Sequence, residues 1–508
     1  MNAFFPPRPF FSRPLLPFRR PLTLLLLAAA NVATHSAQPF IFQDFETSRS
    51  VVFAQDEAPE WNALLERRDG WLAADGIYSV ELNRDAAVKG DVNSPFSPTS
   101  SHFPASAVAA PRRTLFIFSD TLGGSTKNDG RDFREQTMTN HSFAVLTGDA
   151  PKPENAEFFW RRSTKTGEFA PIKAPVLNSQ NSQNSQNSQN SPNSPNSQNS
   201  QNSQNSQNSQ NSQNSRNNRN SQNNPKNQNN QNGQINKNKP ERLAPRNPLG
   251  VNRWLQDGVV WGDRVWLSAI LVGDAWKPER IDAVSIGLDA NGSPDFNDVR
   301  IDETAPLSFK TEKAQVVFGA AICDDADDGF LYVFGYLDRF DAGSRKDLVV
   351  ARAPRATFDD FSTWRYFDGR AWSPNVADAA RPEAGLVERV STEFSVSKIP
   401  SGANAGRYLL VYTPGVIGDE IAFRVGDNPW GPFGPETIFY RSTVPQEFER
   451  GVRCYNAKAH PTFGDDEKIL VSYNVNRLGT LARRPGEYRP RFVWLRYSTV
   501  DAATNAKR

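Results

Sequence analysis

The sequence predicts an all-β protein, a five-bladed β-propeller that carries a long disordered insertion rich in Asn, Ser and Gln. Three observations lead to this fold class. Short apolar segments separated by Gly and Asp turns recur along the chain, and no apolar pattern of helical period extends over any length. Residues 178–240 consist almost entirely of Asn, Ser and Gln, and strand patterns of the same kind resume after them.

The strand-rich segments group into five units of roughly three or four strands each. Residues 70–82 and 114–121 open the first unit, and residues 258–272 give the second a strand, a Gly-Asp turn and another strand. The later units begin near residues 316, 393 and 457. A β-sandwich is the alternative, but about 400 foldable residues exceed what one sandwich normally holds.

Two segments precede the first unit. Residues 40–42 and 51–53 are apolar, and one of them is a candidate for a strand that closes the ring of sheets at its end. Residues 60–68 have the pattern of a short helix leading into Gly70.

Residues 1–37 resemble a secretion signal. Arginines precede an apolar run at residues 22–30, and small residues at 33–37 offer cleavage sites. The apolar run is shorter than the ~20 residues that span a bilayer, so a cleaved signal is favoured over a membrane anchor. No other stretch is apolar enough to span. We expect a monomer that is secreted, periplasmic or held at the cell surface.

The remaining chain is expected to form one propeller domain from two segments. Residues 38–177 supply its start and first blade, and residues 241–508 supply the other blades. The tract at 178–240 cannot offset the entropy of ordering, so we interpret it as a disordered, solvent-exposed insertion. A linker between two domains is the alternative, which the resumption of strand patterns makes less favoured.

The composition argues against several classes of function. The formal net charge is +2, but the signal and the polar tract carry basic residues and no acid. The rest of the chain is therefore mildly acidic, which argues against nucleic-acid binding. The sequence has no Gly-rich phosphate loop and no GxSxG motif.

Cysteine and histidine are scarce. Cys323 and Cys454 are the only cysteines, and in an exported protein they either pair or remain thiols. Three histidines follow the signal, too few with two cysteines to suggest a zinc site. We expect no metal and no cofactor.

The first unit carries the most informative acids. Asp75 precedes the apolar run of one strand, and Asp120 follows the apolar run of the next. If the two strands pair antiparallel, both carboxylates lie at the same end of one sheet. Two carboxylates converging in this way are the arrangement used to cleave glycosidic bonds, so we assign Asp75 and Asp120 as candidate catalytic residues.

Further polar residues are expected to join them, most of them at the starts of the innermost strands. Asn140 and His141 instead precede the apolar strand at 142–146, which should run antiparallel to its neighbour and return to the same end of the sheet. The candidates for substrate binding or for tuning the pKa of the acids are Asn140, His141, Asp257, Glu393, Lys458 and His460. Each has a structural alternative. Asp and Glu at strand ends often bond local backbone N–H groups, and His460 before a proline is equally explained as a buried, hydrogen-bonded residue.

Two other motifs are weaker. Residues 324–329 (DDADDG) resemble a calcium loop without the acid that should follow it, so a solvated hairpin turn is favoured. Residues 427–433 (DNPWGPF) form a Pro/Gly turn with aromatic edges. That turn either frames a sugar platform or packs between blades, and packing is favoured.

Several motifs resemble one family of secreted propellers. WLAADGIYSV at 71–80 followed by LFIFSDT at 115–121 resembles the opening blade of DUF4185- and DUF5005-like proteins, W-x-G-A-D-G-x-Y-S-V and L-F-G-D-T. NHS at 140–142, EFSV at 393–396, NPWGP at 428–432 and YNAKAHP at 455–461 resemble later elements of that family and, more loosely, of arabinanase- and levansucrase-type hydrolases. The resemblance covers about residues 61–497 apart from the tract.

The resemblance implies a five-bladed propeller. Some DUF4185-like relatives are endo-acting D-arabinan hydrolases that use two Asp of the first blade, which correspond to Asp75 and Asp120. This chain departs from the pattern at Ser119, where the family usually has Gly, and in a Pro/Ser-rich insertion at 94–113. Both departures keep the acids, but the insertion is placed to cover or reshape the cleft.

Two functions follow from these patterns. The first is an exported glycoside hydrolase that acts on a polysaccharide or oligosaccharide, arabinan-type by resemblance, through Asp75 and Asp120. The second is a non-catalytic propeller that binds carbohydrate or protein at the cell surface.

Overall fold

The computed structural model describes residues 40–43, 49–83, 111–161, 169–172, 249, 252–273, 277–324, 326–343, 345–402, 404–444, 451–477 and 482–501. All belong to one compact unit, Pro39–Arg508. The signal at 1–37, the tract at 178–240 and most of the insertion at 94–113 lie outside the described residues.

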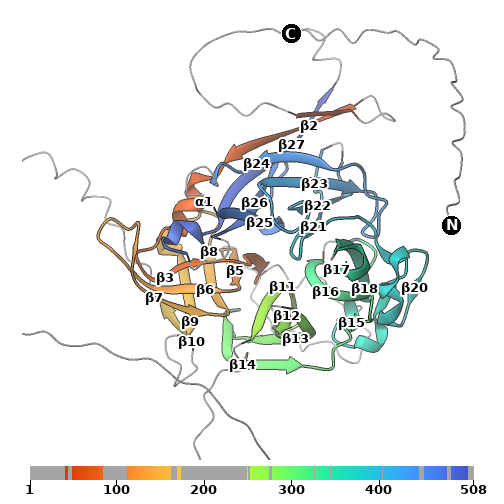
Figure 1. The fold of residues 1–508 in the computed structure, drawn as a ribbon, viewed down its shortest axis with the longest axis horizontal. Helices are drawn as coiled ribbons and strands as arrows, with labels where there is room; N and C mark the ends of the chain where they lie inside the picture. Colours follow the sequence, from red (N-terminus) through yellow and green to blue (C-terminus); the bar gives the residue numbers. More distant parts are fainter. Residues whose placement is uncertain are drawn as a thin grey trace, which may run out of the picture. The chain divides into compact units, whose positions relative to one another are not determined.

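The described chain is almost entirely β-structure, as the sequence predicts (Figure 1). Six antiparallel sheets are present in the described residues. The first is ordered β4 (Tyr78–Glu81), β5 (Arg113–Phe118), β8 (Ser142–Thr147), β9 (Ala156–Arg161) and β10 (Phe169–Ile172). The second is β11 (Arg253–Trp261), β12 (Arg264–Val272), β13 (Pro278–Leu288) and β14 (Pro294–Asp302).

The third and fourth sheets come from the middle of the chain. The third is ordered β15 (Ser308–Lys310), β16 (Ala314–Cys323), β17 (Phe330–Arg339), β18 (Arg345–Pro354), β19 (Arg365–Phe367) and β20 (Trp372–Ser373). The fourth is ordered β21 (Ser395–Lys398), β22 (Tyr408–Tyr412), β23 (Glu420–Gly426) and β24 (Thr437–Arg441).

The fifth sheet joins the two ends of the described chain. Its order is β25 (Val452–His460), β26 (Lys468–Arg477), β27 (Arg491–Asp501), β2 (Arg49–Glu57) and β1 (Phe40–Gln43). The expectation of an early strand that completes the last sheet is therefore confirmed. The expected helix is also present, but as the shorter α1 (Pro59–Leu64).

One structural detail of the first unit differs from the prediction. Residues 70–82 are not a single strand: β3 (Asp69–Ala74) and β4 are separated at residues 75–77. β3 forms the sixth sheet with β6 (Thr121–Thr126) and β7 (Phe133–Thr139). The break occurs at Gly76, whose φ of 59° lies in the left-handed region that ends a strand.

Five strands from successive sheets lie next to one another in a closed order. β4 contacts β11, β11 contacts β16, β16 contacts β21, β21 contacts β25, and β25 contacts β4. Serine hydroxyl groups also join neighbouring sheets. Ser119 Oγ donates to Leu255 O at 3.1 Å, Ser268 Oγ donates to Gly319 O at 2.9 Å, and Ala459 N donates to Ser395 Oγ at 2.7 Å.

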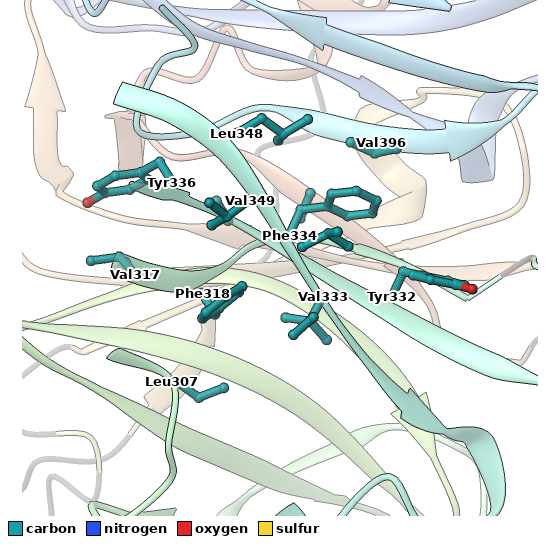
Figure 2. Close-up of a cluster of buried hydrophobic side chains, with 14 of the residues drawn as sticks. Leu307, Val317, Phe318, Tyr332, Val333, Phe334, Tyr336, Leu348, Val349 and Val396 are labelled. Carbon is teal, nitrogen blue, oxygen red and sulfur yellow. The ribbon is translucent and has the colours of Figure 1, made fainter. Parts of the chain in front are cut away.

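The third sheet contains the core of the largest hydrophobic cluster. Phe318 on β16, Val333 and Phe334 on β17 and Val349 on β18 are fully buried (Figure 2). Residues of β16, β17 and β18 alternate between the two faces of the sheet and are buried on both, so this part of the third sheet is covered on both sides. The predicted apolar runs of this unit thus become strands buried between neighbouring sheets.

The aromatic turn at 427–433 packs into this framework. Trp430 stacks on Tyr332 with ring centroids 5.8 Å apart and meets Trp372 edge-on, which is the packing alternative for residues 427–433. Cys323 and Cys454 are buried thiols in different hydrophobic clusters. Among the described residues, no helix is long and apolar enough to cross a membrane.

Candidate functional site

Asp75 and Asp120 meet at one end of the first sheet. β4 and β5 pair antiparallel with Tyr78 opposite Ile117, so the residues before β4 lie beside those after β5. Asp75 N donates to Asp120 O at 3.1 Å, and Ser119 N donates to Asp75 O at 2.9 Å. The two acids therefore lie side by side, as the sequence predicts. We call this end, together with the corresponding starts of β11, β16, β21 and β25, the acid rim.

The backbone at Asp75 is held by close packing. A Cβ atom on Gly76 would lie 2.3 Å from Ser119 Oγ, so only glycine allows the turn to approach β5 this closely. Behind it, Trp71 Nε1 donates to Ser142 Oγ at 3.0 Å, and Thr121 Oγ1 lies 2.7 Å from the same oxygen. These buried bonds tie the crossing of β3, β6 and β8 and fix the position of both acids.

Asp75 has the more strongly raised pKa of the pair. Burial, followed by the negative charges of Asp120 and Glu393, raises its pKa to about 8. Tyr455 Oη donates to Asp75 Oδ2 at 2.7 Å, and the Tyr488 hydroxyl also faces the carboxyl; both favour its charged form and oppose the shift. Asp75 Oδ1 is buried and has no hydrogen-bond partner among the described residues.

Asp120 is held by two donors. Trp254 Nε1 donates to Oδ1 at 3.0 Å, and Asn140 Nδ2 donates to the same oxygen at 3.3 Å. Burial raises the pKa of Asp120 to about 6, and these two hydrogen bonds limit the rise. Because the donors favour the ionised form, Asp120 loses its proton more readily than Asp75.

Asn140 reaches Asp120 because β8 returns to the acid rim. Phe118 at the end of β5 lies opposite Ser142 at the start of β8, which confirms the predicted antiparallel return. The two residues that precede β8 therefore lie next to those that follow β5. One of them, Asn140, turns toward Asp120, and the other, His141, does not.

Glu393 and Lys458 form a buried ion pair next to Asp75. Lys458 Nζ lies 2.5 Å from Glu393 Oε2, and the Lys458 side chain is only 1% exposed. The same Nζ lies 4.2 Å from the centroid of the Tyr78 ring. The pair joins β25 to the start of β21 and presents its ammonium group to β4.

Asp257 lies in the neighbouring sheet and is bound by backbone groups. Its Oδ1 accepts from Gly258 N at 2.9 Å, and its Oδ2 accepts from Ile322 N of β16 at 2.7 Å. Burial nevertheless raises its pKa to about 7, while the charge of Lys458 lowers it. Its hydrogen bonds link β11 to β16, which is the structural role expected of an acid in a strand.

Asp257 and Lys458 do not lie at the starts of their strands, contrary to the sequence-based expectation. Both are inside long strands at β-bulges, between Leu255 and Gly258 in β11 and between Tyr455 and Lys458 in β25. A bulge adds residues on one strand, bends it and redirects side chains. The sequence pattern showed the strands but not these irregularities, so it placed the strand starts too late.

The two histidines are packed inside the sheets. His460 is fully buried, with Nδ1 2.9 Å from Ser79 Oγ and Nε2 2.8 Å from Ser472 Oγ. Burial and then the charge of Lys458 lower the His460 pKa to about 3. This is the buried, hydrogen-bonded alternative, and His460 is the last residue of β25 and not at its start, contrary to the sequence-based expectation. His141 packs against Phe143 and Phe169, and burial lowers its pKa to about 4.

Sequence reasoning did not identify four aromatic residues of the site. Tyr455, Tyr488 and Trp254 touch the two acids, and Tyr78 lies under Lys458. Two of them lie in motifs that the sequence shows, Tyr78 in WLAADGIYSV at 71–80 and Tyr455 in YNAKAHP at 455–461. Trp254 and Tyr488 carry no such signal, because they are far from their partners in the chain; Trp254 and Asp120 are separated by 134 residues.

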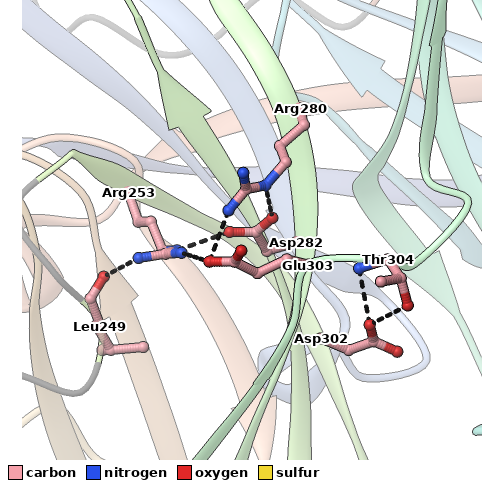
Figure 3. Close-up of polar contacts among 7 residues, drawn as sticks. All are labelled: Leu249, Arg253, Arg280, Asp282, Asp302, Glu303 and Thr304. Carbon is pink, nitrogen blue, oxygen red and sulfur yellow. Dashed lines mark hydrogen bonds and ion pairs between the residues drawn. The ribbon is translucent and has the colours of Figure 1, made fainter.

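The position of Trp254 depends on an ion-pair network at the start of β11 (Figure 3). The adjacent Arg253 pairs with the fully buried Asp282 at 2.7 Å and with Glu303 at 3.0 Å. Arg280 pairs with the same two acids, at 2.6 and 2.7 Å. Two guanidinium groups compensate the buried carboxylate, and the network anchors the strand from which Trp254 reaches Asp120.

Three solved structures with low sequence identity align with this chain. A "putative hydrolase" from Bacteroides ovatus aligns over 90% of this chain and 93% of its own, with 13% identity and a TM-score of 0.50. An exo-β-1,3-galactanase from Phanerochaete chrysosporium aligns over 50% of both chains (12% identity, TM-score 0.27). A GH43_1 enzyme from Xanthomonas citri in complex with xylose aligns over 50% of this chain and 89% of its own (11%, 0.21).

At the sequence level, a comparison with curated proteins gives no match. Residues 187–497, more than half of the chain, match the family described as "Domain of unknown function (DUF5005)". The match begins beyond the first unit, so Asp75 and Asp120 precede it, whereas Asp257, Glu393 and Lys458 lie within it. The resemblance to DUF5005 is thus confirmed, and the chain belongs to the DUF5005 family.

Proposed function

We propose that this protein is an exported glycoside hydrolase that cleaves a polysaccharide between the carboxyl groups of Asp75 and Asp120. One observation carries the proposal: two adjacent carboxyl groups have environments that separate their pKa values. Glycoside cleavage requires one carboxyl group that is protonated and one that is ionised at the same pH.

The roles follow from the contacts of each acid. Asp75, whose pKa is raised to about 8, holds its proton at neutral pH and donates it to the leaving oxygen. Asp120, whose pKa is raised only to about 6, is ionised and acts as nucleophile or as the base that activates water. The two titrations are linked, so the order of proton loss is the property that matters here.

The other residues of the site support this division. Lys458 holds Glu393 in an ion pair at 2.5 Å, and the negative charge of Glu393 helps to keep Asp75 protonated. Asn140 and Trp254 hold Asp120 through Oδ1. We assign no substrate contact to His460, since both of its ring nitrogens are bonded to serine hydroxyls.

The architecture proposed for this activity is a five-bladed propeller. The closed order of contacts among β4, β11, β16, β21 and β25 supports five blades, with the β3–β6–β7 sheet as an addition to the first. The resemblance of the first-unit motifs to those of DUF4185-like enzymes makes an arabinan-type polymer the first substrate to test. Export through a signal at 1–37, an exposed insertion at 178–240 and a monomeric state complete the proposal.

The test replaces each acid singly. Asp75→Asn and Asp120→Asn should each lower kcat on a cleaved polysaccharide by about 10²–10⁴-fold, the contribution of one acid–base group. The assay is sugar release from a panel that includes arabinan, xylan and β-1,3-galactan. Asp360→Asn, at an exposed turn, is the matched control and should leave the rate unchanged.

The outcomes separate the two candidate functions. A rate that survives both substitutions contradicts the assignment of Asp75 and Asp120. Binding of a polysaccharide without sugar release by the unaltered protein favours the non-catalytic propeller instead.

A further inference from the structure

Few large apolar side chains are exposed in the part of the chain that the structure describes. Large apolar side chains with more than about a third of their surface exposed occur, among the described residues, at Met138, Phe309, Phe340, Val416 and Ile417. Met138 pairs with Leu122, two residues from Asp120. Phe309 pairs with the start of β16, and Phe340 N donates to Lys313 O just before that start. Val416 and Ile417 are the two that are adjacent in the chain, whereas exposed apolar residues that occur singly are ordinary.

Val416 and Ile417 are the pair nearest to Asp75. They lie at the tip of the segment that joins β22 to β23. Ile417 forms an isolated β-bridge with Tyr455, the residue whose hydroxyl binds Asp75. Gly418 N donates to Cys454 O at 3.0 Å, and Ala457 N donates to Thr413 Oγ1 at 3.1 Å.

This segment follows the edge of β25 that does not pair with another strand. β25 pairs with β26 through its other edge, with Tyr455 opposite Asn474. The segment begins after β22, beside the start of β21. Val411, near the end of β22, lies opposite Ser395, and Ser395 comes two residues after Glu393. The tip therefore lies between the start of β21 in the fourth sheet, where Glu393 lies, and the β-bulge that follows Tyr455 in β25 of the fifth sheet.

The tip is held in place although its side chains are exposed. Gly415 N donates to Arg389 O at 2.7 Å before the pair, and Gly418 is bonded to β25 after it. Val416 is 40% exposed and Ile417 is 48% exposed. A fixed backbone loses little conformational entropy when a ligand covers its side chains, so this pair is suited to binding.

We propose that Val416 and Ile417 form the apolar wall of a substrate subsite, against which one sugar ring of the polysaccharide rests its C–H face. This inference rests on the proposed function and extends it to sugar units beside the cleaved bond. The ligand is a neutral polymer longer than one sugar, because the wall lies beyond the carboxyl pair.

A sugar ring fits this wall better than a protein partner does. Two aliphatic side chains are far smaller than the roughly 800 Å² that each partner buries in a stable protein interface. Their backbone is bridged to Tyr455 of β25, the residue whose hydroxyl donates to Asp75. A ring of a bound polymer needs only a small apolar contact flanked by polar groups, as in most ligand sites.

The test measures binding without cleavage. Soluble linear arabinan is titrated into the full chain carrying Asp75→Asn, with and without the double substitution Val416→Ser/Ile417→Ser; xylan and β-1,3-galactan are the further arms. The serine pair should raise Kd about tenfold, the effect of losing about 60 Å² of apolar contact. The conservative pair Val416→Ile/Ile417→Val should stay within about twofold, since it keeps the apolar surface.

The possible results are distinct. Unchanged affinity of the serine pair, with an unchanged unfolding temperature, overturns the subsite and leaves the proposed function standing. A change in oligomeric state on gel filtration without a change in affinity also overturns it, because a second copy then covers the pair. If the Asp75→Asn chain binds none of the three polymers, the proposed function itself fails.

Discussion

Asp75 combines a charge-bearing side chain with a site that disfavours charge. Its ordinary pKa of 3.8 is raised to about 8, first by burial and then by Asp120 and Glu393. The folded state therefore retains a proton that the unfolded chain releases above about pH 4. Stability from this residue is largest at low pH and is lost as the pH rises through the window from about 4 to 8.

Replacing Asp75 by Asn should consequently stabilise the fold at neutral and alkaline pH. The amide cannot ionise, and the Tyr455 hydroxyl can still donate to its oxygen. We expect the free energy of unfolding to increase by about 1–2 kcal/mol at pH 8, with a smaller gain at pH 5. Thermal unfolding of both proteins at the two pH values measures the effect.

Asp360→Asn provides a control of the opposite sign. The Asp360 carboxylate accepts from Ser362 N at 3.0 Å and Ser362 Oγ at 2.7 Å, and these bonds lower its pKa. Its contribution is present above the ordinary pKa and lost in acid, so this substitution should lower the unfolding temperature at pH 8. An Asp75→Asn chain that is less stable than the parent at pH 8 would show that Asp75 is a structural residue.

At the scale of single residues, the sequence predicts the two acids, Asp75 and Asp120, but not the side chains that contact them. Asp75 and Asp120 were found because strand pairing is local, and an antiparallel pair brings its ends together by necessity. Tyr455, Tyr488 and Trp254 reach the acids through the closure of the whole chain. Nothing in the local pattern of a tyrosine or tryptophan distinguishes such a contact from ordinary core packing.

The strands themselves were largely predicted. The hairpin at 258–272 occurs as β11 and β12, with the turn at residues 262–263 and Trp261 opposite Arg264. The bulges were not predicted, because an extra residue changes the register without changing the alternation of apolar residues enough to be seen. In β16 the bulge between Phe318 and Ala321 contains Gly319, with φ of 109°.

Gly319 should be among the least replaceable glycines in the described chain. A Cβ atom there would lie 2.1 Å from Ser268 Oγ and 2.3 Å from Ser268 Cβ, so rotation of the serine cannot relieve the clash. We expect Gly319→Ala to lower the free energy of unfolding by about 2–4 kcal/mol through strain and overpacking. Urea unfolding followed by tryptophan fluorescence is the measurement.

Gly329→Ala isolates the backbone part of this effect. Its φ is 80°, and no heavy atom lies within 4 Å of the added Cβ. The cost should be about 1–2 kcal/mol, the strain of a left-handed residue alone. Equal effects of the two substitutions would mean that the sheets adjust at Gly319 and that close approach is not required there.

At the scale of the whole molecule, the two ends of the described chain depend on each other. β2 pairs with β27 over nine residues, from Arg49 opposite Asp501 to Glu57 opposite Val493. Arg496 also pairs with Asp56 across this boundary. Because β2 pairs with β27, the fifth sheet can be completed only after both segments have been synthesised. This contact is therefore the longest-range step of folding.

Removing residues 1–57, and with them β1 and β2, should therefore also destabilise the strands of the fifth sheet that remain. β27 would lose its outer partner and expose a row of unpaired backbone groups, which favours aggregation. We expect the unfolding temperature to fall by several degrees, and the soluble fraction at high concentration to decrease. A chain that lacks only residues 1–38 keeps β1 and β2 and is the matched control. If both shortened chains unfold at the same temperature, β2 is a passive addition, and the fifth sheet is held by β25, β26 and β27 alone.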